Sequence, residues 1–444
     1  MSHELPCAYD RSQNWNLVQT TGTINRAAKV ITRCQKLASF TEDPGSTRRT
    51  FLSPPMRDCH EEITRWIEPL GVQVRIDAAG NLRAVCPAAQ PNAPRLLIGS
   101  HLDTVPNAGA YDGILGVVLA VALLEELEGR RLPFAIEVVG FSEEEGVRFG
   151  VPFIGSRALV GRLDQQLLDI QDAQGISIRK AIEKFGLNPE EIPRAQLENN
   201  TLGYLEFHIE QGPVLEKLNL PLAAVEAIAG QSRLEFTFLG RANHAGTTPM
   251  HLRCDAIAGA AEWIGAVERT AQGIAGLVAT VGKIEAQPGA ANVIAAEARL
   301  TLDVRHSSDE IRTRAVEEII HQSEQIAGRR GLSVRLSTLL SQRAVAMDPS
   351  FIAGIEQAMI KTRCEPHKMV SGAGHDAMIL AEKVPSAMIF LRTPGGISHD
   401  PAESVAAEDV ERAIQCGLHF LDQLASSPEF QHATFNKEQR ISRA

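Results

Sequence analysis

The hydrophobic pattern of the first half of the chain predicts a strand–helix–strand unit at residues 95–141. Residues 95–100 and 134–141 are short apolar runs typical of buried strands, and residues 114–127 predict a helix buried on more than one face. Strands joined by such a helix run parallel, with a right-handed crossover. We therefore expect an α/β domain with a largely parallel central sheet.

Shorter periodic segments flank this unit. Apolar residues at helical spacing predict helices at 23–40 and 59–70, with a loop between them, and residues 72–86 predict two strands around an Ala-Gly-Asn turn. Residues 157–200 have a mostly helical pattern. The other elements expected in this domain are a strand at 202–209, a helix at 352–359, a strand at 386–391 and a helix at 407–424. The first 20 residues and the tail from 426 are polar, and we expect them to be loose.

After Gly230 the pattern changes to alternating apolar and polar positions, typical of half-exposed antiparallel strands. The predicted elements are strands at 233–240, 277–286, 298–306 and 332–340, with helices at 254–267 and 309–326. This order is typical of a split βαβ, ferredoxin-like sandwich. We therefore expect residues 228–342 to form an inserted α+β domain between two parts of the α/β domain, residues 1–227 and 343–444.

Size and charge narrow the class of protein. A chain of 444 residues is too long for one ordinary domain, and its net charge of −10 argues against a nucleic-acid surface. The longest apolar run, residues 113–124, is shorter than the roughly 20 residues that a membrane span needs, and the N-terminus has no apolar h-region, so we expect no signal peptide. The seven cysteines are scattered without a C-x-x-C, which favours reduced thiols and a cytoplasmic location.

Candidate metal ligands follow the two strands of the first unit. His101 comes directly after one strand, and Glu144 and Glu145 come just after the next. Because ligands bind beyond the carboxyl ends of parallel strands, these side chains are expected to meet at one edge. Asp103 lies two residues after His101, where its carboxylate could orient the ring, and Asp112 lies in a Gly-rich turn. Taken singly, His101 could be a surface loop histidine, Asp112 a helix cap, and the glutamates a solvated acidic run. Taken together, these residues favour a metal site.

A dinuclear hydrolase needs one carboxylate that bridges two metals and a free carboxylate nearby as general base. The adjacent residues Glu144 and Glu145 could divide the metal-binding and base roles between them. Further ligands must come from elsewhere in the chain. His208 and His399 again lie where a strand gives way to a loop, and His244 and His375 are the other eligible histidines.

Together these motifs resemble the carbamoylase/hydantoinase branch of the dinuclear metal amidohydrolases related to aminoacylases. That branch includes N-carbamoyl-L-amino-acid hydrolases, β-ureidopropionases and allantoate amidohydrolases. The matching stretches, in order from about residue 99 to 403, are GSHLDTVPNAGAYDGILG, FSEEEGVRFGVPFIGSRAL, YLEFHIEQGPVLE, GRANHAGTTPM, NVIAAEARLTLDVRH, SGAGHDAMIL and GGISHDPAE. Long motifs in series are more specific than one short pattern.

The resemblance implies that Asp112 bridges two divalent cations, which could be Zn, Mn, Co or Ni. It implies four further ligands, His101 and His208 for one cation, and Glu145 and His399 for the other. Glu144 matches the general base. The substrate-contacting positions that it implies are Gln231, His244, Asn292, Arg305, Gly374 and His375. It also implies that the inserted domain is a lid that forms a homodimer and lends His244 to the partner's site.

The residue types suit this chemistry, although several have a simpler interpretation. His244 could stabilise the oxyanion, and Arg305 could clamp a substrate carboxylate with two hydrogen bonds or be a paired strand arginine. Asn292 could serve a turn, and His375 could be a structural loop residue. Three functions stay open: hydrolysis of a small ureido acid (an N-carbamoyl-L-amino acid or allantoate), a peptidase or aminoacylase, and a non-enzymatic metal-binding relative. The complete ligand set with Glu144 argues against the third.

Overall fold

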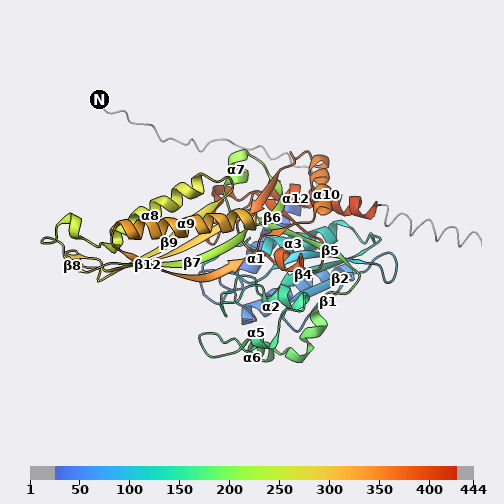
Figure 1. Ribbon diagram of the computed structural model, residues 1–444. Coiled ribbons are helices and arrows are strands. Elements are labelled where there is room, and N and C mark those ends of the chain that lie inside the picture. The colour runs from blue at the N-terminus through green and yellow to red at the C-terminus, as the bar shows by residue number, and fades with distance from the viewer. Residues whose placement is uncertain (1–25, 428–444) are drawn as a thin grey trace, which may run out of the picture.

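A nine-stranded sheet forms the centre of the larger part of the molecule (Figure 1). The computed structural model describes residues 26–427, so the expectations for residues 1–20 and for nearly all of the tail lie outside it. The sheet order is β1-β2-β4-β3-β5-β15-β6-β13, and β14 also pairs with β6. The strands are β1 (Gln73–Ile76), β2 (Leu82–Cys86), β3 (Arg95–His101), β4 (Ala135–Phe141), β5 (Thr201–Ile209), β6 (Leu222–Ile228), β13 (Val345–Ala346), β14 (Lys368–Ser371) and β15 (Ser386–Leu391).

This sheet is mixed, with its continuous run of parallel strands at the centre and one further parallel pair, β14 with β6, at the flank. The neighbours β4, β3, β5 and β15 run parallel, which confirms the predicted unit at residues 95–141. The expectation of a largely parallel sheet is wrong at both flanks, where β2 is antiparallel to β4 and β6 is antiparallel to β15. Strand β6 is not predicted from its segment, LAAVEAI, because that segment is rich in alanine and poor in the β-branched and aromatic residues that mark strands.

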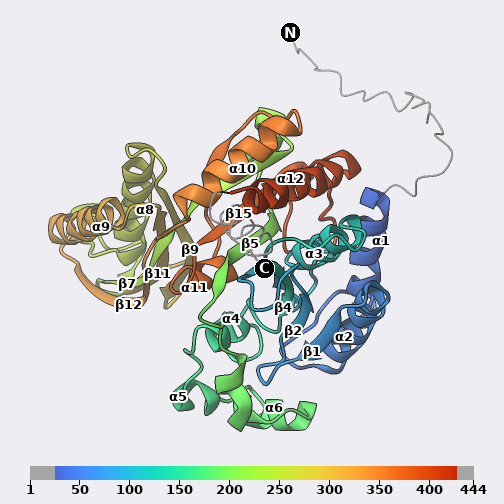
Figure 2. The same cartoon turned by 90° about the vertical axis from the view of Figure 1, so that its right-hand side faces the viewer.

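Helix α3 packs against the central strands, and α1 and α12 pack against it in turn (Figure 2). Its residues from Ile114 to Leu124 are all buried, as its uniformly apolar sequence predicts. Helix α2 begins five residues earlier than predicted, because Pro54 and Pro55 occupy its first turn, where proline is tolerated. The helices of this part are α1 (Arg26–Ala38), α2 (Pro54–Ile67), α3 (Ile114–Glu126), α4 (Ile154–Leu159), α5 (Gln165–Leu168), α6 (Ile178–Phe185), α7 (Val214–Leu218), α10 (Pro349–Lys361), α11 (Asp376–Leu380) and α12 (Ala407–Ala425), with short 3-10 turns at Glu68–Leu70, Pro189–Ala195 and Pro394–Gly396.

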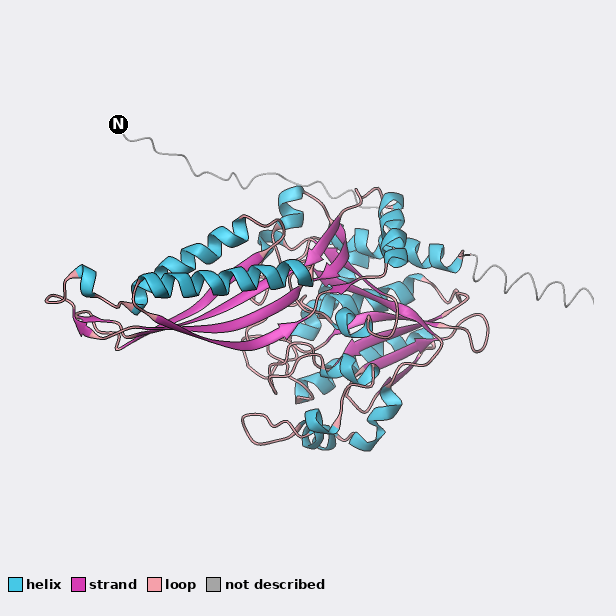
Figure 3. Cartoon of the chain, in the orientation of Figure 1, coloured by secondary structure: helices cyan, strands magenta, loops and turns pink. Residues whose placement is uncertain are grey.

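A second, four-stranded antiparallel sheet projects from this body, with two long helices along one of its faces (Figure 3). Its order is β12-β7-β11-β9, and a short β8–β10 pair lies at its far end (Figure 1). Its elements are β7 (Gly230–Leu239), β8 (Asn243–His244), the 3-10 turn Met250–Leu252, α8 (Ala256–Gln272), β9 (Val278–Gln287), β10 (Val293–Ile294), β11 (Glu297–His306), α9 (Asp309–Arg329) and β12 (Ser333–Gln342). The predicted order of strands and helices is present.

Each sheet has its own hydrophobic core. In the smaller core Trp263 is fully buried, stacks on Phe236 with ring centres 4.3 Å apart, and donates its indole N–H to the Ile319 carbonyl. The six cysteines within residues 26–427 are free, as expected. None of the helices in that range combines the length and hydrophobicity that a membrane span requires. The domain limits 228–342 and the lid role of this part stay predictions.

Candidate metal centre

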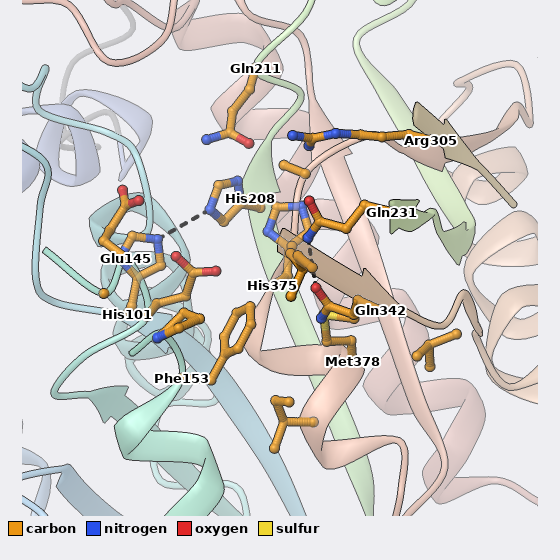
Figure 4. A pocket seen from close by; sticks show the side chains of 18 of the residues that line it. His101, Glu145, Phe153, His208, Gln211, Gln231, Arg305, Gln342, His375 and Met378 are labelled. Atoms are coloured by element: carbon orange, nitrogen blue, oxygen red, sulfur yellow. Dashed lines mark hydrogen bonds between the residues drawn. The ribbon is translucent and has the colours of Figure 1, made fainter. Parts of the chain in front are cut away.

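The predicted ligands meet at the carboxyl edge of the parallel strands. His101 is the last residue of β3, His208 is the next-to-last residue of β5, and Glu144 and Glu145 follow β4 by a few residues. His399 lies in the loop after β15. Figure 4 shows the His101 and His208 rings facing each other, and their Nε2 atoms are 3.5 Å apart. Four strand ends therefore deliver side chains to one place, as the sequence predicts.

Asp112 lies at the centre of this group, and its two oxygens face different partners. Its Oδ1 is 3.2 Å from His208 Nε2 and 3.8 Å from His101 Nε2. Its Oδ2 is 3.1 Å from His399 Nε2, and that nitrogen is 3.7 Å from a Glu145 oxygen. One carboxylate thus connects two separate sets of ligand atoms.

The Gly-rich turn explains how Asp112 approaches His101 so closely. Gly113 has a φ of +68°, and a Cβ atom there would lie 2.3 Å from the His101 ring. A larger residue would strain the backbone and displace that ring. Both the positive φ of the turn and the close contact with the His101 ring therefore require glycine at position 113.

The donor set fits divalent cations. Three groups of ligand atoms each lie within 4.8 Å of one another, namely His101–Asp112–His208, His101–Glu144–Glu145 and Asp112–Glu145–His399. Imidazole and carboxylate together suit zinc and neighbouring transition metals. The first and third groups share Asp112, so the residues present fit a pair of cations bridged by that carboxylate.

Asp103 supports the group in two ways, one of which was not predicted. The His101 Nδ1 lies 3.0 Å from the Asp103 backbone carbonyl oxygen and 3.5 Å from its carboxylate, so the carbonyl is the nearer partner. The carboxylate instead accepts the backbone N–H groups of Glu144 at 2.9 Å and Glu145 at 3.1 Å. Asp103 therefore orients the histidine ring and also fixes the loop that carries the paired glutamates.

Burial and close charges shift the pKa values of these groups. Burial alone would raise the pKa of Asp112, but hydrogen bonds from His208 and His399 outweigh it and hold the pKa well below its usual range. Burial and the charge of Glu145 raise the pKa of Glu144 well above its usual range. Burial and Asp112 raise the pKa of Glu145 to about 7. The ionised carboxylates repel one another in this buried site, and bound cations would offset that repulsion.

Three residues that the sequence analysis did not single out also hold Asp112. The Gln211 amide nitrogen lies 3.1 and 3.0 Å from its two oxygens, and the Ser398 hydroxyl lies 3.4 Å from Oδ2. A Glu403 oxygen accepts the backbone N–H groups of Tyr111 at 2.7 Å and Asp112 at 3.0 Å. Both Gln211 and Glu403 belong to motifs already noted, HIEQGP and GGISHDPAE, but nothing in their local pattern indicates a partner so far away in sequence.

A cleft of about 1300 Å³ opens from the metal ligands and is lined by both parts of the molecule. Of the predicted substrate residues, Gln231, Arg305, Gly374 and His375 line it (Figure 4). Arg305 is already paired, since its guanidinium donates to both oxygens of Asp303 at 2.8 and 2.9 Å. The simpler interpretation of Arg305, a paired strand arginine, thus describes this conformation.

His375 and Gln231 are held by neighbouring side chains. The His375 Nε2 lies 2.8 Å from the Ser371 hydroxyl, and its ring packs edge-on against His208 with centres 4.4 Å apart. Burial and the charge of His208 lower the pKa of His375 well below its usual range, so this ring is neutral. The Gln231 amide donates to the Gln342 side-chain oxygen at 2.6 Å.

His244 and Asn292 do not join the site within one chain. Both are exposed, at the β8–β10 end of the second sheet, and neither lines the cleft. His244 Nδ1 accepts the backbone N–H of Gly246 at 3.0 Å, which fixes the ring at the hairpin. Within a single chain, the predicted oxyanion role of His244 therefore has no geometric support.

The fold and the site define a class of protein: an α/β scaffold whose histidines and carboxylates converge at the carboxyl edge of parallel strands, a usual place for a catalytic centre. Residues 97–423 match Peptidase family M20/M25/M40. The chain belongs to that family, and it is a hydrolase.

Individual relatives agree with the resemblance of the motifs. Over 403 residues the chain is 38% identical to the N-carbamoyl-L-amino acid amidohydrolase of Geobacillus stearothermophilus, covering 88% of this chain and 97% of that protein. Over 431 residues it is 35% identical to allantoate deiminase 2 of Glycine max, covering 89% of each. A hydantoinase/carbamoylase family amidase from Burkholderia multivorans has a similar solved structure, with a TM-score of 0.85, 29% identity and coverage of 90% of this chain and 98% of that one.

Proposed function

We propose that this protein hydrolyses the carbamoyl C–N bond of an N-carbamoyl-L-amino acid or a related ureido acid, giving the amino acid, CO2 and ammonia. The observation that carries the proposal is Asp112, whose two oxygens face separate sets of ligand atoms in a buried acidic centre. Allantoate is the second candidate substrate, because allantoate deiminases are as extensively similar to this chain as the carbamoyl hydrolases are. An N-acyl or dipeptide substrate on the same scaffold is the remaining alternative.

Two divalent cations, of Zn, Mn, Co or Ni, would be held by residues that are already in place. His101 and His208 would bind one cation, Glu145 and His399 the other, and Asp112 both. When bound, such cations polarise a carbonyl group and lower the pKa of a coordinated water to about 7. The protein contributes the fixed positions of these side chains, which Asp103, Gln211 and Glu403 secure.

Glu144 is the proposed general base. Its side chain is 8% exposed at the bottom of the cleft, and its backbone N–H is fixed by Asp103. Its buried position beside the proposed ligands suits a carboxylate that takes a proton from the attacking water and returns it to the departing nitrogen. The neighbouring His375 is neutral and hydrogen-bonded, so we assign it a role in shaping the pocket beside Gly374.

The second sheet is the proposed lid and dimerisation domain. Gln231 and Arg305 would contact the substrate from the same chain, with Arg305 as the group for the substrate α-carboxylate once Asp303 releases or shares it. His244 and Asn292 would contact the substrate bound by the partner subunit, because both lie exposed at the far end of the lid. His244 would there stabilise the oxyanion.

A substrate panel tests this proposal. Protein loaded with cations is expected to release ammonia from N-carbamoyl-L-amino acids or from allantoate, with little action on N-acetyl amino acids and dipeptides. Glu144→Gln should lower kcat by about 1000-fold or more, since proton transfer and charge at this position are both lost. Glu382→Gln, at an exposed position of the same cleft, is the control and should retain activity.

Two results would contradict the proposal. Preference for dipeptides over every ureido acid would assign the site to a peptidase. Unchanged ureido turnover in Glu144→Gln would remove Glu144 from the mechanism.

A further inference from the structure

Five arginines line the cleft, and four of them are paired with carboxylates. The pairs are Arg162 with Glu382 at 2.6 Å, Arg233 and Arg305 with Asp303 at 2.9 and 2.8 Å, and Arg343 with Asp309 at 3.3 Å. Arg157 makes no ion pair with any residue in the range 26–427. It is therefore the one cleft arginine in that range without an ion pair, and the carboxylates of Glu382 and Asp164 act on it only at longer range.

The protein nevertheless holds the Arg157 side chain in place. Its Nε–H donates to the Pro152 carbonyl oxygen at 3.0 Å, which turns the guanidinium back toward the start of α4. Pro152 and Phe153 line the cleft beside it. This one bond uses a single donor of the five that a guanidinium has, so the other four are available to a ligand.

Helix α4 is attached to the loop that carries the paired glutamates. The Phe153 N–H donates to the Glu144 carbonyl oxygen at 3.2 Å, and the Gly155 N–H donates to the Glu143 carbonyl oxygen at 3.3 Å. A Cβ atom on Gly155 would lie 2.9 Å from the backbone nitrogen of Ser142, so the helix is in close contact with this loop. The position of Arg157 is thus fixed relative to the proposed general base.

The surroundings of Arg157 favour an anion. Its side chain is half-buried, and burial together with the nearby Arg162 lowers its pKa by more than the charges of Glu382 and Asp164 raise it. A partly desolvated cation without a carboxylate in direct contact is unfavourable, and a planar carboxylate pairs with a guanidinium through two parallel hydrogen bonds. A substrate with a neutral side chain would leave this guanidinium without such a contact.

We infer that Arg157 forms a second anion subsite that binds an acidic side chain of the substrate, so that the preferred substrates are ureido acids with two carboxylates, such as N-carbamoyl-L-aspartate and N-carbamoyl-L-glutamate. The inference rests on the proposed function, in which Arg305 takes the α-carboxylate. The two arginines lie on different parts of the molecule, Arg157 on α4 and Arg305 on β11. They would bind opposite ends of one substrate.

The test compares kcat/KM on N-carbamoyl-L-aspartate and N-carbamoyl-L-alanine. Arg157→Met keeps the aliphatic stem, and it should lower kcat/KM on the aspartate derivative by about 10- to 100-fold, the value of a charge-assisted pair. The alanine derivative should change by less than about threefold, because it has no group for this subsite. The matched control is Arg343→Met, whose arginine also lines the cleft and is already paired with Asp309, and it should leave the ratio of the two values unchanged.

Folding is checked by thermal unfolding, and Arg157→Lys should restore part of the preference. Equal losses on both substrates, or a wild-type protein that favours the alanine derivative, would overturn the subsite. Binding of N-carbamoyl-L-aspartate to Glu144→Gln protein with and without Arg157→Met tests the subsite apart from turnover. If the wild-type protein hydrolyses no ureido acid but this binding still depends on Arg157, the proposed function is wrong and the anion subsite is retained.

Discussion

Asp112 depends on residues that hold its backbone as well as on those that face its carboxylate. Glu403 is 5% exposed and accepts the N–H groups of Tyr111 and Asp112 with one oxygen. Burial and the charge of Asp112 raise the pKa of Glu403 to about 7. The turn that carries the proposed bridging ligand is therefore fixed by a residue almost three hundred positions later in the chain.

We predict that Glu403→Ala weakens cation binding by about 10- to 100-fold, as the loss of a group that orients a metal ligand typically does. Competition with a chromogenic chelator measures this affinity without relying on turnover. Glu408→Ala, an exposed position at the start of α12, is the control and should bind cations as the wild type does. Equal affinity of Glu403→Ala and wild type would show that the turn keeps its shape without Glu403.

At the level of single residues, the sequence predicted the proposed metal ligands better than the residues that hold those ligands in position. His101, His208 and Glu145 follow apolar runs, so the strand-end rule was enough to place them together. Gln211 and Glu403 were missed because their partners lie 99 and 291 positions away, and no local pattern carries that information. The exposed position of His244 could not be deduced from residue type at all, since it depends on where the second sheet ends.

At the level of elements, the close packing of α3 against the sheet determines the position of the turn that carries Asp112. Gly116 lies so close to β5 that a Cβ atom there would be 2.2 Å from the Phe207 carbonyl oxygen and 2.7 Å from the Ser100 Cβ. Since backbone cannot move aside as a flexible side chain can, this contact requires glycine.

Gly116→Ala is therefore expected to lower the free energy of unfolding by about 1–3 kcal/mol, the usual cost of overpacking. Gly328→Ala is the matched control, because Gly328 lies at an exposed position of helix α9 with no atom within 4 Å of the added Cβ. That change should raise stability by up to about 1 kcal/mol through helix propensity. Denaturant unfolding of both variants measures the difference, and equal effects would contradict the close contact.

Element prediction succeeded where periodicity was strong and failed where composition was ambiguous. The alternating strands of the second sheet and the uniformly apolar α3 were found close to their observed limits. The Ala-rich β6 and the two-residue strands were missed, because pairing with neighbouring strands, rather than intrinsic preference, makes them strands. The antiparallel flank formed by β6 and β13 follows from these missed pairings, whereas β1 and β2 were predicted as strands and only the pairing of β2 with β4 was not.

At the level of the whole molecule, residues of both the α/β body and the second sheet line the cleft. His244 is not among them and belongs to β8, which lies at the far end of the second sheet (Figure 1). The proposed homodimer resolves this separation if each lid lends its His244 to the other subunit. If each subunit contributes one residue to the other subunit's site, a dimer of two different inactive variants contains one site in which both residues are intact. Such a mixed dimer is therefore active.

Mixing His244→Ala with Glu144→Gln protein is accordingly expected to restore activity to about one quarter of the wild-type value, since half of the dimers would be mixed and each would have one complete site. Each variant alone should be nearly inactive. The measurement is ammonia release after the two proteins are unfolded and refolded together. No recovery despite a confirmed mixed dimer would show that His244 does not act across the interface.

We propose that the two ligand groups that share Asp112 bind two cations, and that both cations are needed for ureido hydrolysis. The most direct measurement titrates chelator-treated protein with Zn²⁺, Mn²⁺, Co²⁺ or Ni²⁺, and follows the number of bound ions by elemental analysis and ammonia release from ureido acids in the same samples. We expect no turnover in the metal-free protein, full turnover at two ions per chain, and loss of both in Asp112→Ala. Full turnover without bound cations, or unchanged binding of two ions by Asp112→Ala, would contradict the account.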